Sequence, residues 1–281
     1  MHRLVELMGH TACTDGLAAL RFWGQTGDRS AAWIAAVDPV HLEARLDRLC
    51  LHALYGQQMP MSELRPIFDF LQQTFGSERY AFARIGHNAY LRGDLEMASA
   101  RVSAKFVDGR SPDEMMPRRG GRDGGTEMYH RLVSEVQMAL HEHEINIARE
   151  KAGRPAANSI WIWGGGTAAQ ATSEPVMPLF CDDPLYKGYW LSRNGRVEPW
   201  PKGFEPCIQR AKNGFIAVTP EIEVDGQPEA PDRYLYGLRK LLKSKKIKRL
   251  TVLFRDGLQI DLRNRDVYRF WRRESRQLLP R

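Results

Sequence analysis

Apolar side chains recur at intervals of three and four residues in three segments of the chain, and this spacing predicts three amphipathic helices. The first covers residues 62–75, where Ser62 offers an N-cap and Gly76 a C-terminal stop. The second and longest covers 126–151. The third covers 234–245. Helices are therefore expected along the whole length of the chain.

Shorter runs of alternating or continuous apolar residues predict strands. Asn194-Gly195 is typical of a two-residue hairpin turn, and Asp256-Gly257 indicates a second hairpin. After the first strand, Asp38 and Pro39 predict a turn into a helix, because aspartate caps exposed N–H groups and proline fits the first helical turn. The predicted strands are 31–37, 80–85, 89–92, 188–193, 197–200, 214–219, 250–254 and 258–262.

Residues 158–163 are apolar on both alternating faces, which predicts a strand buried on both sides. The expected fold class is mixed α/β (α+β): a mixed sheet with this central buried strand, flanking helices and C-terminal antiparallel hairpins. The Pro- and Gly-rich stretch 111–125 predicts a flexible loop between an N-terminal part, 1–110, and a C-terminal part, 126–281. A single domain is also compatible with this length.

Composition narrows the class of protein without indicating a reaction. The chain has 281 residues, of which 43% are hydrophobic and 27% charged, as in ordinary globular proteins with a packed core. No apolar run approaches the ~18 residues of a membrane span, and the N-terminus lacks a signal-peptide pattern. We therefore expect a cytoplasmic protein with no membrane association.

The cysteines point to the same compartment. Cys13, Cys50, Cys181 and Cys207 lie far apart and form no Cys-x-x-Cys pair. A disulfide scaffold is not expected, and neither is a zinc site of the usual spaced-cysteine type.

Positive charge is concentrated at the C-terminal end. Residues 232–281 contain 16 Lys and Arg against 5 Asp and Glu, whereas the rest of the chain is slightly acidic. Such a segment could attract phosphates, but a solvated basic face is the alternative. The basic positions cluster at Lys243, Lys245, Lys246, Lys248 and Arg249, and again at Arg269, Arg272, Arg273 and Arg276 around Phe270 and Trp271.

The densest group of candidate site residues lies where the long predicted helix meets the buried strand. Helical spacing places Glu135, Asn146 and Arg149 on one face, and Asn158 follows just before the strand. His141 and His143 are two positions apart on a helix, so they point in different directions and do not chelate one ion. The predicted ligand-binding set is Glu135, Asn146, Arg149, Asn158, Trp161, Trp163, Gly164, Gly165 and Gly166.

Three consecutive glycines, Gly164 to Gly166, follow the tryptophan-rich strand. Their backbone N–H groups could bind an anion, as phosphate loops do. They could equally let a neighbouring backbone approach closely beside Trp161 and Trp163. The sequence leaves these two interpretations open.

Six segments carry a resemblance to a known family: 38–42, 135–138, 141–149, 153–166, 250–262 and 270–273. In these segments the sequence closely resembles the bacterial RpfE-type regulatory proteins, and the resemblance spans nearly the whole chain from Trp33 onward. That family is described as related to archaeal-type cofactor-independent phosphoglycerate mutase, of the alkaline-phosphatase superfamily, and the likeness to the mutase covers only a short central segment. The resemblance implies a phosphate-ester ancestry with two divalent metals, and it adds Asp38 and His41 as secondary site residues.

The sequence departs from the mutase pattern at the positions that would bind metal. It has no Asp-Gly-x-Gly-Asp near its start, no serine nucleophile in context and no Gly-Asp-His near its end. We therefore expect a non-catalytic regulatory or ligand-binding protein with no metal or other cofactor, acting on an unknown protein or a small phosphorylated ligand. A phosphomutase or phosphatase that uses Mn²⁺ or Mg²⁺ is the alternative. Nucleic-acid binding through the basic tail is a second alternative, disfavoured because no DNA-reading motif is present.

Overall fold

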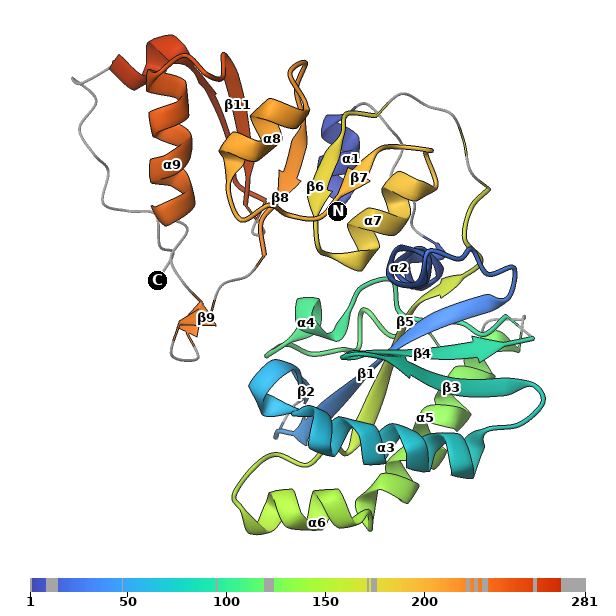
Figure 1. Cartoon of the computed structure of the whole chain (residues 1–281). Coiled ribbons are helices and arrows are strands. Elements are labelled where there is room, and N and C mark those ends of the chain that lie inside the picture. The colour runs from blue at the N-terminus through green and yellow to red at the C-terminus, as the bar shows by residue number, and fades with distance from the viewer. Residues whose placement is uncertain are drawn as a thin grey trace. The chain divides into compact units, whose positions relative to one another are not determined.

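The fold is described from a computed structural model, in which the chain divides into two compact units. The smaller unit contains residues 1–12, 176–182 and 196–281, and the larger unit contains residues 13–175 and 183–195. Each unit is described by itself (Figure 1). The described residues are 2–8, 15–46, 48–94, 96–118, 124–170, 172, 176–220, 223–224, 227–228, 232–254 and 257–268.

An antiparallel five-stranded sheet organises the larger unit. Its longest strand, β1, pairs with β5 along one edge, and along the other edge it pairs first with β4 and then with β2. Strand β3 pairs with β4. The strand bounds are β1 Trp33–Ala44, β2 Leu49–Ala53, β3 Tyr80–Ile85, β4 Asn88–Gly93 and β5 Ser159–Gly166.

Helices cover both faces of this sheet. Figure 1 shows α2 on one face and α3 and α5 on the other. The main hydrophobic core lies on the second side, where Trp33, Ala35 and Val37 of β1 are clustered with residues of α3 and α5. The helices are α2 Leu17–Thr26, α3 Met61–Phe75, α4 Ala104–Val107, α5 Gly125–His141, α6 Glu144–Lys151 and α7 Pro184–Leu191, with a 3₁₀ turn η1 at Gly56–Gln58.

Two glycines allow α2 and α7 to pack backbone against backbone. A Cβ atom added at Gly188 would lie 1.7 Å from the carbonyl oxygen of Leu20, and one at Gly24 would lie 1.9 Å from that of Pro184. Only glycine fits at such a close approach. Helix α7 is thereby fixed against α2, which lies on the sheet.

The smaller unit is built from short elements. Strands β7, β6 and β8 form a parallel sheet in that order, and Phe180 of β6 packs with Trp200 and Cys207 in a small core. Strands β11 and β12 form an antiparallel hairpin. The elements are α1 His2–Leu7, β6 Leu179–Cys181, β7 Val197–Glu198, α8 Phe204–Arg210, β8 Ile216–Val218, β9 Glu223–Val224, β10 Gln227–Pro228, α9 Asp232–Lys243, β11 Arg249–Leu253, β12 Gln259–Arg263 and η2 Asn264–Tyr268.

The predicted mixed α/β class is confirmed, including antiparallel hairpins near the C-terminus. The helix predicted over 62–75 is α3, the strand pair over 80–92 is β3 and β4, and the predicted buried strand is β5. Segment 111–125 lies inside the larger unit, and the division predicted there remains a prediction. Among the described helices, none is both long enough and apolar enough to span a bilayer.

The predicted turn into a helix at Asp38 is wrong, because β1 continues from Trp33 to Ala44. Strand pairing on both edges outweighs the local capping preference. Pro39 lacks an N–H group, but its carbonyl accepts a bond from Leu54 N at 3.1 Å. Long-range pairing therefore decides this segment.

The single helix predicted over 126–151 is divided in two, since α5 ends at His141 and α6 begins at Glu144. His143 is the N-cap of α6, and its Nδ1 accepts a bond from Ile145 N at 3.2 Å. Its imidazole also packs edge-on against Phe70, with ring centroids 4.8 Å apart. Burial lowers the pKa of His143, which favours the neutral form that this cap requires.

The predicted hairpin around Asn194-Gly195 is also wrong. Residues 184–191 form helix α7, which Asp183 caps through a bond from Leu185 N at 2.8 Å. Asn194 adopts a positive φ of 52° in the turn after this helix. Of the second predicted hairpin, the two strands are present as β11 and β12, whereas Asp256 in its turn lies outside the described residues.

Candidate functional site

Asn146 is buried at the start of α6. Its side-chain amide bonds to the backbone of two segments, the end of α5 and the segment before β5. Its Nδ2 donates to the carbonyl oxygens of Leu140, at 2.8 Å, and Ala157, at 3.0 Å. Its Oδ1 accepts from Ala157 N at 2.8 Å. One amide side chain therefore joins the end of α5 to the segment that enters β5.

Arg149 lies one helical turn further along α6 and is only 1% exposed. Its guanidinium donates to the carbonyl oxygens of Pro155, at 2.7 Å, and Gln58, at 2.9 Å, and it forms an ion pair with Glu63 of α3. Arg154 pairs with the other carboxylate oxygen of Glu63. Burial alone would raise the pKa of Glu63, but the hydrogen bonds from the two arginines outweigh it and hold the pKa below its ordinary value.

Asn158 and His41 join β1 to the segment before β5. Leu42 N donates to Asn158 Oδ1 at 2.7 Å, and Asn158 Nδ2 donates back to Leu42 O at 2.9 Å. His41 Nδ1 lies 2.8 Å from the carbonyl oxygen of Ala156. The amide of Asn158 thus replaces a backbone pair at the point where the β1–β5 ladder ends.

The three glycines at the end of β5 pack closely and use their backbone groups internally. Gly164 N donates to Ala100 O at 2.7 Å, and Gly165 N donates to Ser99 Oγ at 2.9 Å. A Cβ atom at Gly165 would lie 2.5 Å from the indole of Trp33, and one at Gly166 would lie 2.6 Å from Gly16 N. These contacts support the close-approach interpretation of the glycines.

The two tryptophans of β5 have different surroundings. Trp161 Nε1 donates to Val102 O at 2.8 Å. Trp163 lies beside Arg21, whose guanidinium carbon is 5.0 Å from the Trp163 ring centroid and 4.8 Å from that of Tyr90. Arg21 is therefore a buried cation held between two aromatic rings.

Asp38 provides the negative charge next to Arg21. Burial raises the pKa of its carboxyl, while the Arg21 charge and a bond from Ala104 N, at 3.1 Å, oppose this effect. Among the described residues, Arg21 Nε and Trp163 Nε1 are buried without a partner in hydrogen-bond geometry. Trp163 also lowers the pKa of Asp38, but by less than Arg21 or the bond from Ala104 N. Perturbed, incompletely paired groups of this kind are typical of functional sites.

Glu135 is not part of either polar group. It is exposed on α5, and the break after His141 removes the common helix face that it was predicted to share with Asn146 and Arg149. Near it, an open depression of about 530 Å³ includes Asn158 in its wall. The other lining residues are Leu42, Ala44, Leu49, Gln137, Met138 and His141.

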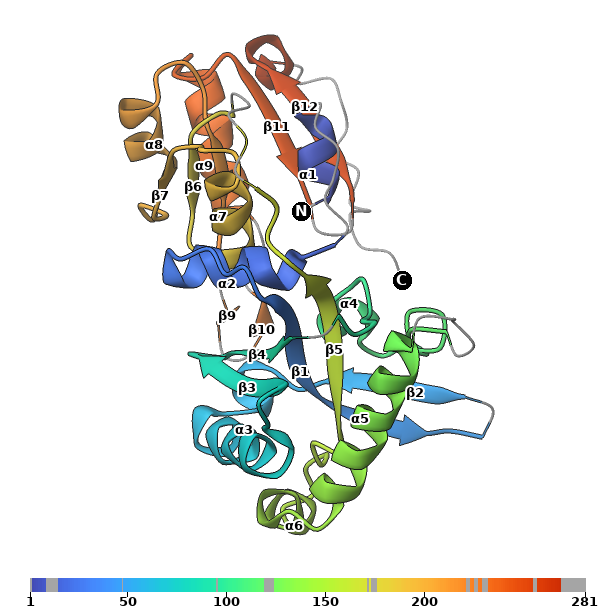
Figure 2. The same cartoon turned by 90° about the vertical axis from the view of Figure 1, so that its right-hand side faces the viewer.

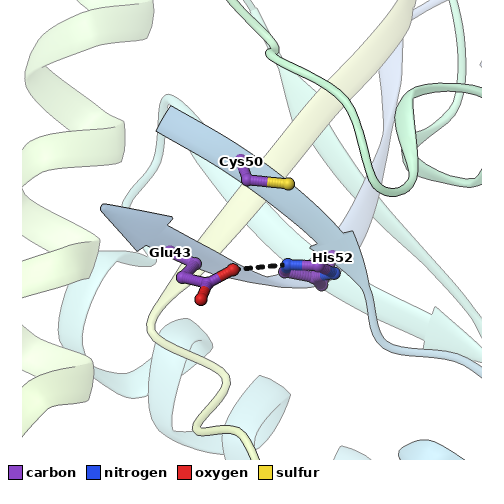
Figure 3. A group of neighbouring side chains, drawn as sticks. All are labelled: Glu43, Cys50 and His52. Atoms are coloured by element: carbon purple, nitrogen blue, oxygen red, sulfur yellow. Dashed lines mark hydrogen bonds and ion pairs between the residues drawn. The ribbon is translucent and has the colours of Figure 1, made fainter. Parts of the chain in front are cut away.

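A third group of side chains could hold a metal ion. Glu43 of β1 and Cys50 and His52 of β2 place one potential ligand atom each within 4.8 Å of one another. Figure 3 shows the carboxylate of Glu43 directed at the imidazole of His52, with Oε2 and Nε2 3.0 Å apart. In the part of the chain that the structure describes, this is the one such group of three or more residues.

The basic positions after α9 are exposed on the smaller unit. Lys245, Lys246 and Lys248 all belong to this surface. The second basic cluster, with Arg269, Arg272, Arg273 and Arg276 around Phe270 and Trp271, lies outside the described residues. Nucleic-acid binding through this tail remains a prediction.

Several residues of these groups could not be identified from the sequence. Arg21 and Tyr90 complete the environment of Asp38, and Glu63 completes that of Arg149. A signal for Arg21 was its position beside Leu17 and Leu20 on the apolar side of a short helix. Glu43, Cys50 and His52 can be recognised as a group only when β1 and β2 are known to be paired strands.

The chain matches no established family profile. It is distantly homologous to cofactor-independent phosphoglycerate mutases. The 2,3-bisphosphoglycerate-independent phosphoglycerate mutase of Methanosarcina acetivorans is 37% identical over 109 residues, which are 38% of this chain and 26% of the relative. That of Methanosarcina barkeri is 26% identical over 113 residues, 39% of this chain and 27% of the relative. The alignments thus span about a quarter of these relatives.

A solved structure shows a weaker likeness. The cofactor-independent phosphoglycerate mutase from Thermoplasma acidophilum has a TM-score of 0.43 and 16% sequence identity. The match covers 76% of this chain and 62% of the mutase.

Proposed function

We propose that this chain is a phosphoglycerate-mutase-related regulatory protein of the cytosol that binds a partner without catalysing the mutase reaction. One observation carries the proposal. Asn146, Arg149 and Asn158, which were predicted to bind a ligand, use their polar groups to hold the chain's own backbone. These contacts support a structural role for the three residues.

The energetics of Arg149 support this interpretation. Directing its guanidinium to a substrate phosphate would leave Glu63 with Arg154 as its remaining partner and would free two backbone carbonyls. Giving up these hydrogen bonds and this ion pair costs free energy. A phosphate contact would have to exceed this cost before it contributed to binding.

The chemistry of the open depression favours a protein partner over a small phosphorylated ligand. Its wall combines Leu42, Leu49 and Met138 with the polar side chains of Gln137 and His141. The side chain of Met138 is prominent, since the residue is 70% exposed. Lysine and arginine, the side chains that usually bind phosphate, are not among its lining residues. A mixed surface with exposed methionine suits a peptide or protein.

The catalytic alternative rests on Asp38. A carboxyl with a raised pKa beside a buried arginine is the type of group that acts as a general acid or base. In this alternative the chain is a phosphomutase or phosphatase dependent on Mn²⁺ or Mg²⁺, with Asp38 and His41 in the active site.

A turnover assay separates the two proposals. The purified chain is incubated with 3-phosphoglycerate, and separately with an aryl phosphate, in Mn²⁺ or Mg²⁺, with an authentic mutase as the positive control. No turnover is expected. Metal-dependent turnover that is abolished in both Asp38→Ala and His41→Ala would overturn the non-catalytic proposal and establish the alternative.

The depression is tested by partner capture. The chain is immobilised, and binding partners are compared between the original sequence and the double variant Met138→Glu, His141→Glu. We expect a specific protein that is retained by the original sequence and lost with the variant. Retention of the same proteins by both would exclude this depression as the binding surface. Glu135→Gln on the same helix is the matched control, because Glu135 does not line the depression.

A further inference from the structure

The β1–β2 hairpin arranges four potential metal ligands on one face. In its antiparallel register His41 is opposite His52, and Glu43 is opposite Cys50. Side chains alternate between the faces of a strand, so two positions two residues apart on each strand share a face. The sequence His-x-Glu in β1 and Cys-x-His in β2 therefore forms a two-by-two array. Figure 2 shows the loop end of this hairpin extending beyond α5.

The spacing of the ligand atoms is close to what a small tetrahedral ion needs. Bond lengths of about 2.0 Å to nitrogen and 2.3 Å to sulfur imply distances of roughly 3.3–3.8 Å between ligands around tetrahedral Zn²⁺. The atoms of Glu43, Cys50 and His52 already lie within 4.8 Å of one another. Small rotations about side-chain bonds would close the remaining gap without moving the paired backbone.

His41 is the candidate for a fourth bond, although it is not among the three residues whose ligand atoms lie within 4.8 Å of one another. A carbonyl oxygen only accepts hydrogen bonds, so the contact with Ala156 O requires that Nδ1 of His41 carries the proton. The lone pair is then on Nε2. Metal-binding histidines are commonly held in this way, with one ring nitrogen bound to a carbonyl and the other to the ion. The ring centroids of His41 and His52 are 6.2 Å apart.

The charges of the group suit a divalent cation. Glu43 supplies a carboxylate, and the structure places His52 Nε2 and Arg45 Nε each 3.0 Å from its Oε2 atom. Cys50 is 2% exposed at the base of the array, and a bound cation would convert its thiol into a thiolate. One carboxylate and one thiolate balance a charge of two. Arg45, which bonds Glu43 at 2.9 Å, would be displaced from that oxygen.

We propose that His41, Glu43, Cys50 and His52 form a mononuclear Zn²⁺ site on the β1–β2 hairpin. Thiolate and imidazole ligands favour Zn²⁺ over the harder Mg²⁺ and Mn²⁺. The site is thus chemically different from a two-metal phosphomutase centre, and it does not depend on the binding function proposed above. Through the contact between His41 and Ala156, it would connect the loop half of the hairpin to the segment before β5.

The test measures metal binding and sulfur ligation on the full chain. After removal of metal with a chelator, Zn²⁺ is titrated against a chromophoric competitor, and Co²⁺ is titrated while the near-ultraviolet and visible spectra are recorded. We expect one ion per chain and a thiolate-to-Co²⁺ charge-transfer band. Failure to compete for Zn²⁺, or a Co²⁺ spectrum without that band, would overturn the proposal.

The variants distinguish this site from incidental binding. Cys50→Ser should abolish the charge-transfer band, and His52→Ala should weaken Zn²⁺ binding by at least roughly 10- to 100-fold, the range known for loss of supporting residues alone. His87→Ala, at an exposed turn, and Cys207→Ser, in the smaller unit, should leave both readouts unchanged. A band retained in Cys50→Ser or lost in Cys207→Ser would overturn the assignment.

Two further variants protect against a folding artefact and test the fourth ligand. Glu43→Gln removes a charge from a side chain that is 44% exposed and should fold normally, yet bind Zn²⁺ more weakly. His41→Ala should also weaken binding. Unchanged affinity in the well-folded Glu43→Gln variant would refute the site, whereas unchanged affinity in His41→Ala would remove His41 from it.

Discussion

Arg149 illustrates how a single buried charge can determine local stability. It is 1% exposed and bonded to Glu63 and two backbone carbonyls. Replacing it with methionine keeps much of the volume, but it removes the donor to the two carbonyls and leaves Glu63 with Arg154 as its remaining partner. We expect Arg149→Met to lower the free energy of unfolding by about 3–5 kcal/mol, measured by urea denaturation.

Arg154→Met is the matched control, since Arg154 pairs with the same carboxylate but its side chain is 42% exposed. Its loss should cost about 1 kcal/mol or less, because exposed ion pairs contribute little. Equal losses in the two variants would show that burial of Arg149 is not the source of its effect.

Asp38 gives a pH dependence of defined sign. Burial raises the pKa of its carboxyl above the ordinary value of 3.8, so the folded state binds this proton more tightly than the unfolded state. Its favourable contribution is present below the ordinary pKa and is lost as the pH rises through the folded-state pKa. Asp38→Asn removes this titration.

Urea denaturation at a series of pH values, starting near pH 4, measures the effect. The unfolding free energy of the original chain minus that of Asp38→Asn should decrease as the pH rises. A difference that increases with pH would mean that the attraction of Arg21 dominates over burial. The double variant Asp38→Asn, Arg21→Met tests this, because it removes both charges.

At the level of whole elements, the α2–α7 pair depends on backbone contact. Gly188→Ala would place a Cβ atom 1.7 Å from Leu20 O, so the two helix backbones would have to move apart. We expect the free energy of unfolding to fall by roughly 1–3 kcal/mol or more. Thermal and urea denaturation would measure this change.

Gly237→Ala in α9 is the control for helix propensity. A Cβ atom there meets nothing within 4 Å, so alanine should leave stability unchanged or raise it by about 0.5–1 kcal/mol. Similar destabilisation in both variants would exclude close packing as the cause for Gly188.

Elements that depend on local interactions are predicted from the sequence, whereas elements that depend on long-range pairing are not. The helix Met61–Phe75 is predicted well because its apolar face, its length and its end at Gly76 agree, although Pro60 and not Ser62 is its N-cap. Asp38-Pro39 was misjudged because cap residues are a local signal, whereas strand pairing to β5 comes from more than 100 residues away. Residues 188–193 were misjudged because Asn194-Gly195 ends a helix as readily as it joins two strands.

The sequence predicts which residues belong to the candidate site, but it does not predict what those residues bind. Asn146, Arg149 and Asn158 were identified from their types and spacing, yet their partners are backbone groups, which have no sequence signature. Glu63 and Arg21 come from distant helices. The ligand array of the hairpin became visible only with the β1–β2 register, which depends on the correct assignment of β1.

At the scale of the whole molecule, the chain crosses between its two units several times. Residues 176–182 belong to the smaller unit, while 183–195 return to the larger one as α7. Helix α7 packs against α2, so the chain must come back to the larger unit at residue 183. The sequence carries no signal for this packing, which only the tertiary contacts show.

Because the chain has two units, Zn²⁺ binding is expected to protect one unit from hydrogen exchange and not the other. A ligand that binds only the folded state stabilises it by about 2.7 kcal/mol at a concentration of 100 times its Kd. The proposed ligands all belong to the larger unit. One equivalent of Zn²⁺ should therefore slow amide hydrogen exchange in peptides covering β1 and β2, as followed by mass spectrometry.

Peptides that cover β11, in the smaller unit, serve as the internal reference and should exchange at the same rate with and without Zn²⁺. Cys50→Ser should exchange identically in both conditions throughout. Protection of β11 to the same degree as β1, or protection that persists in Cys50→Ser, would indicate general binding of zinc to surface histidines. Protection confined to the hairpin and its neighbours, and dependent on Cys50, requires an ion held between the two strands, because only such an ion stabilises their pairing selectively.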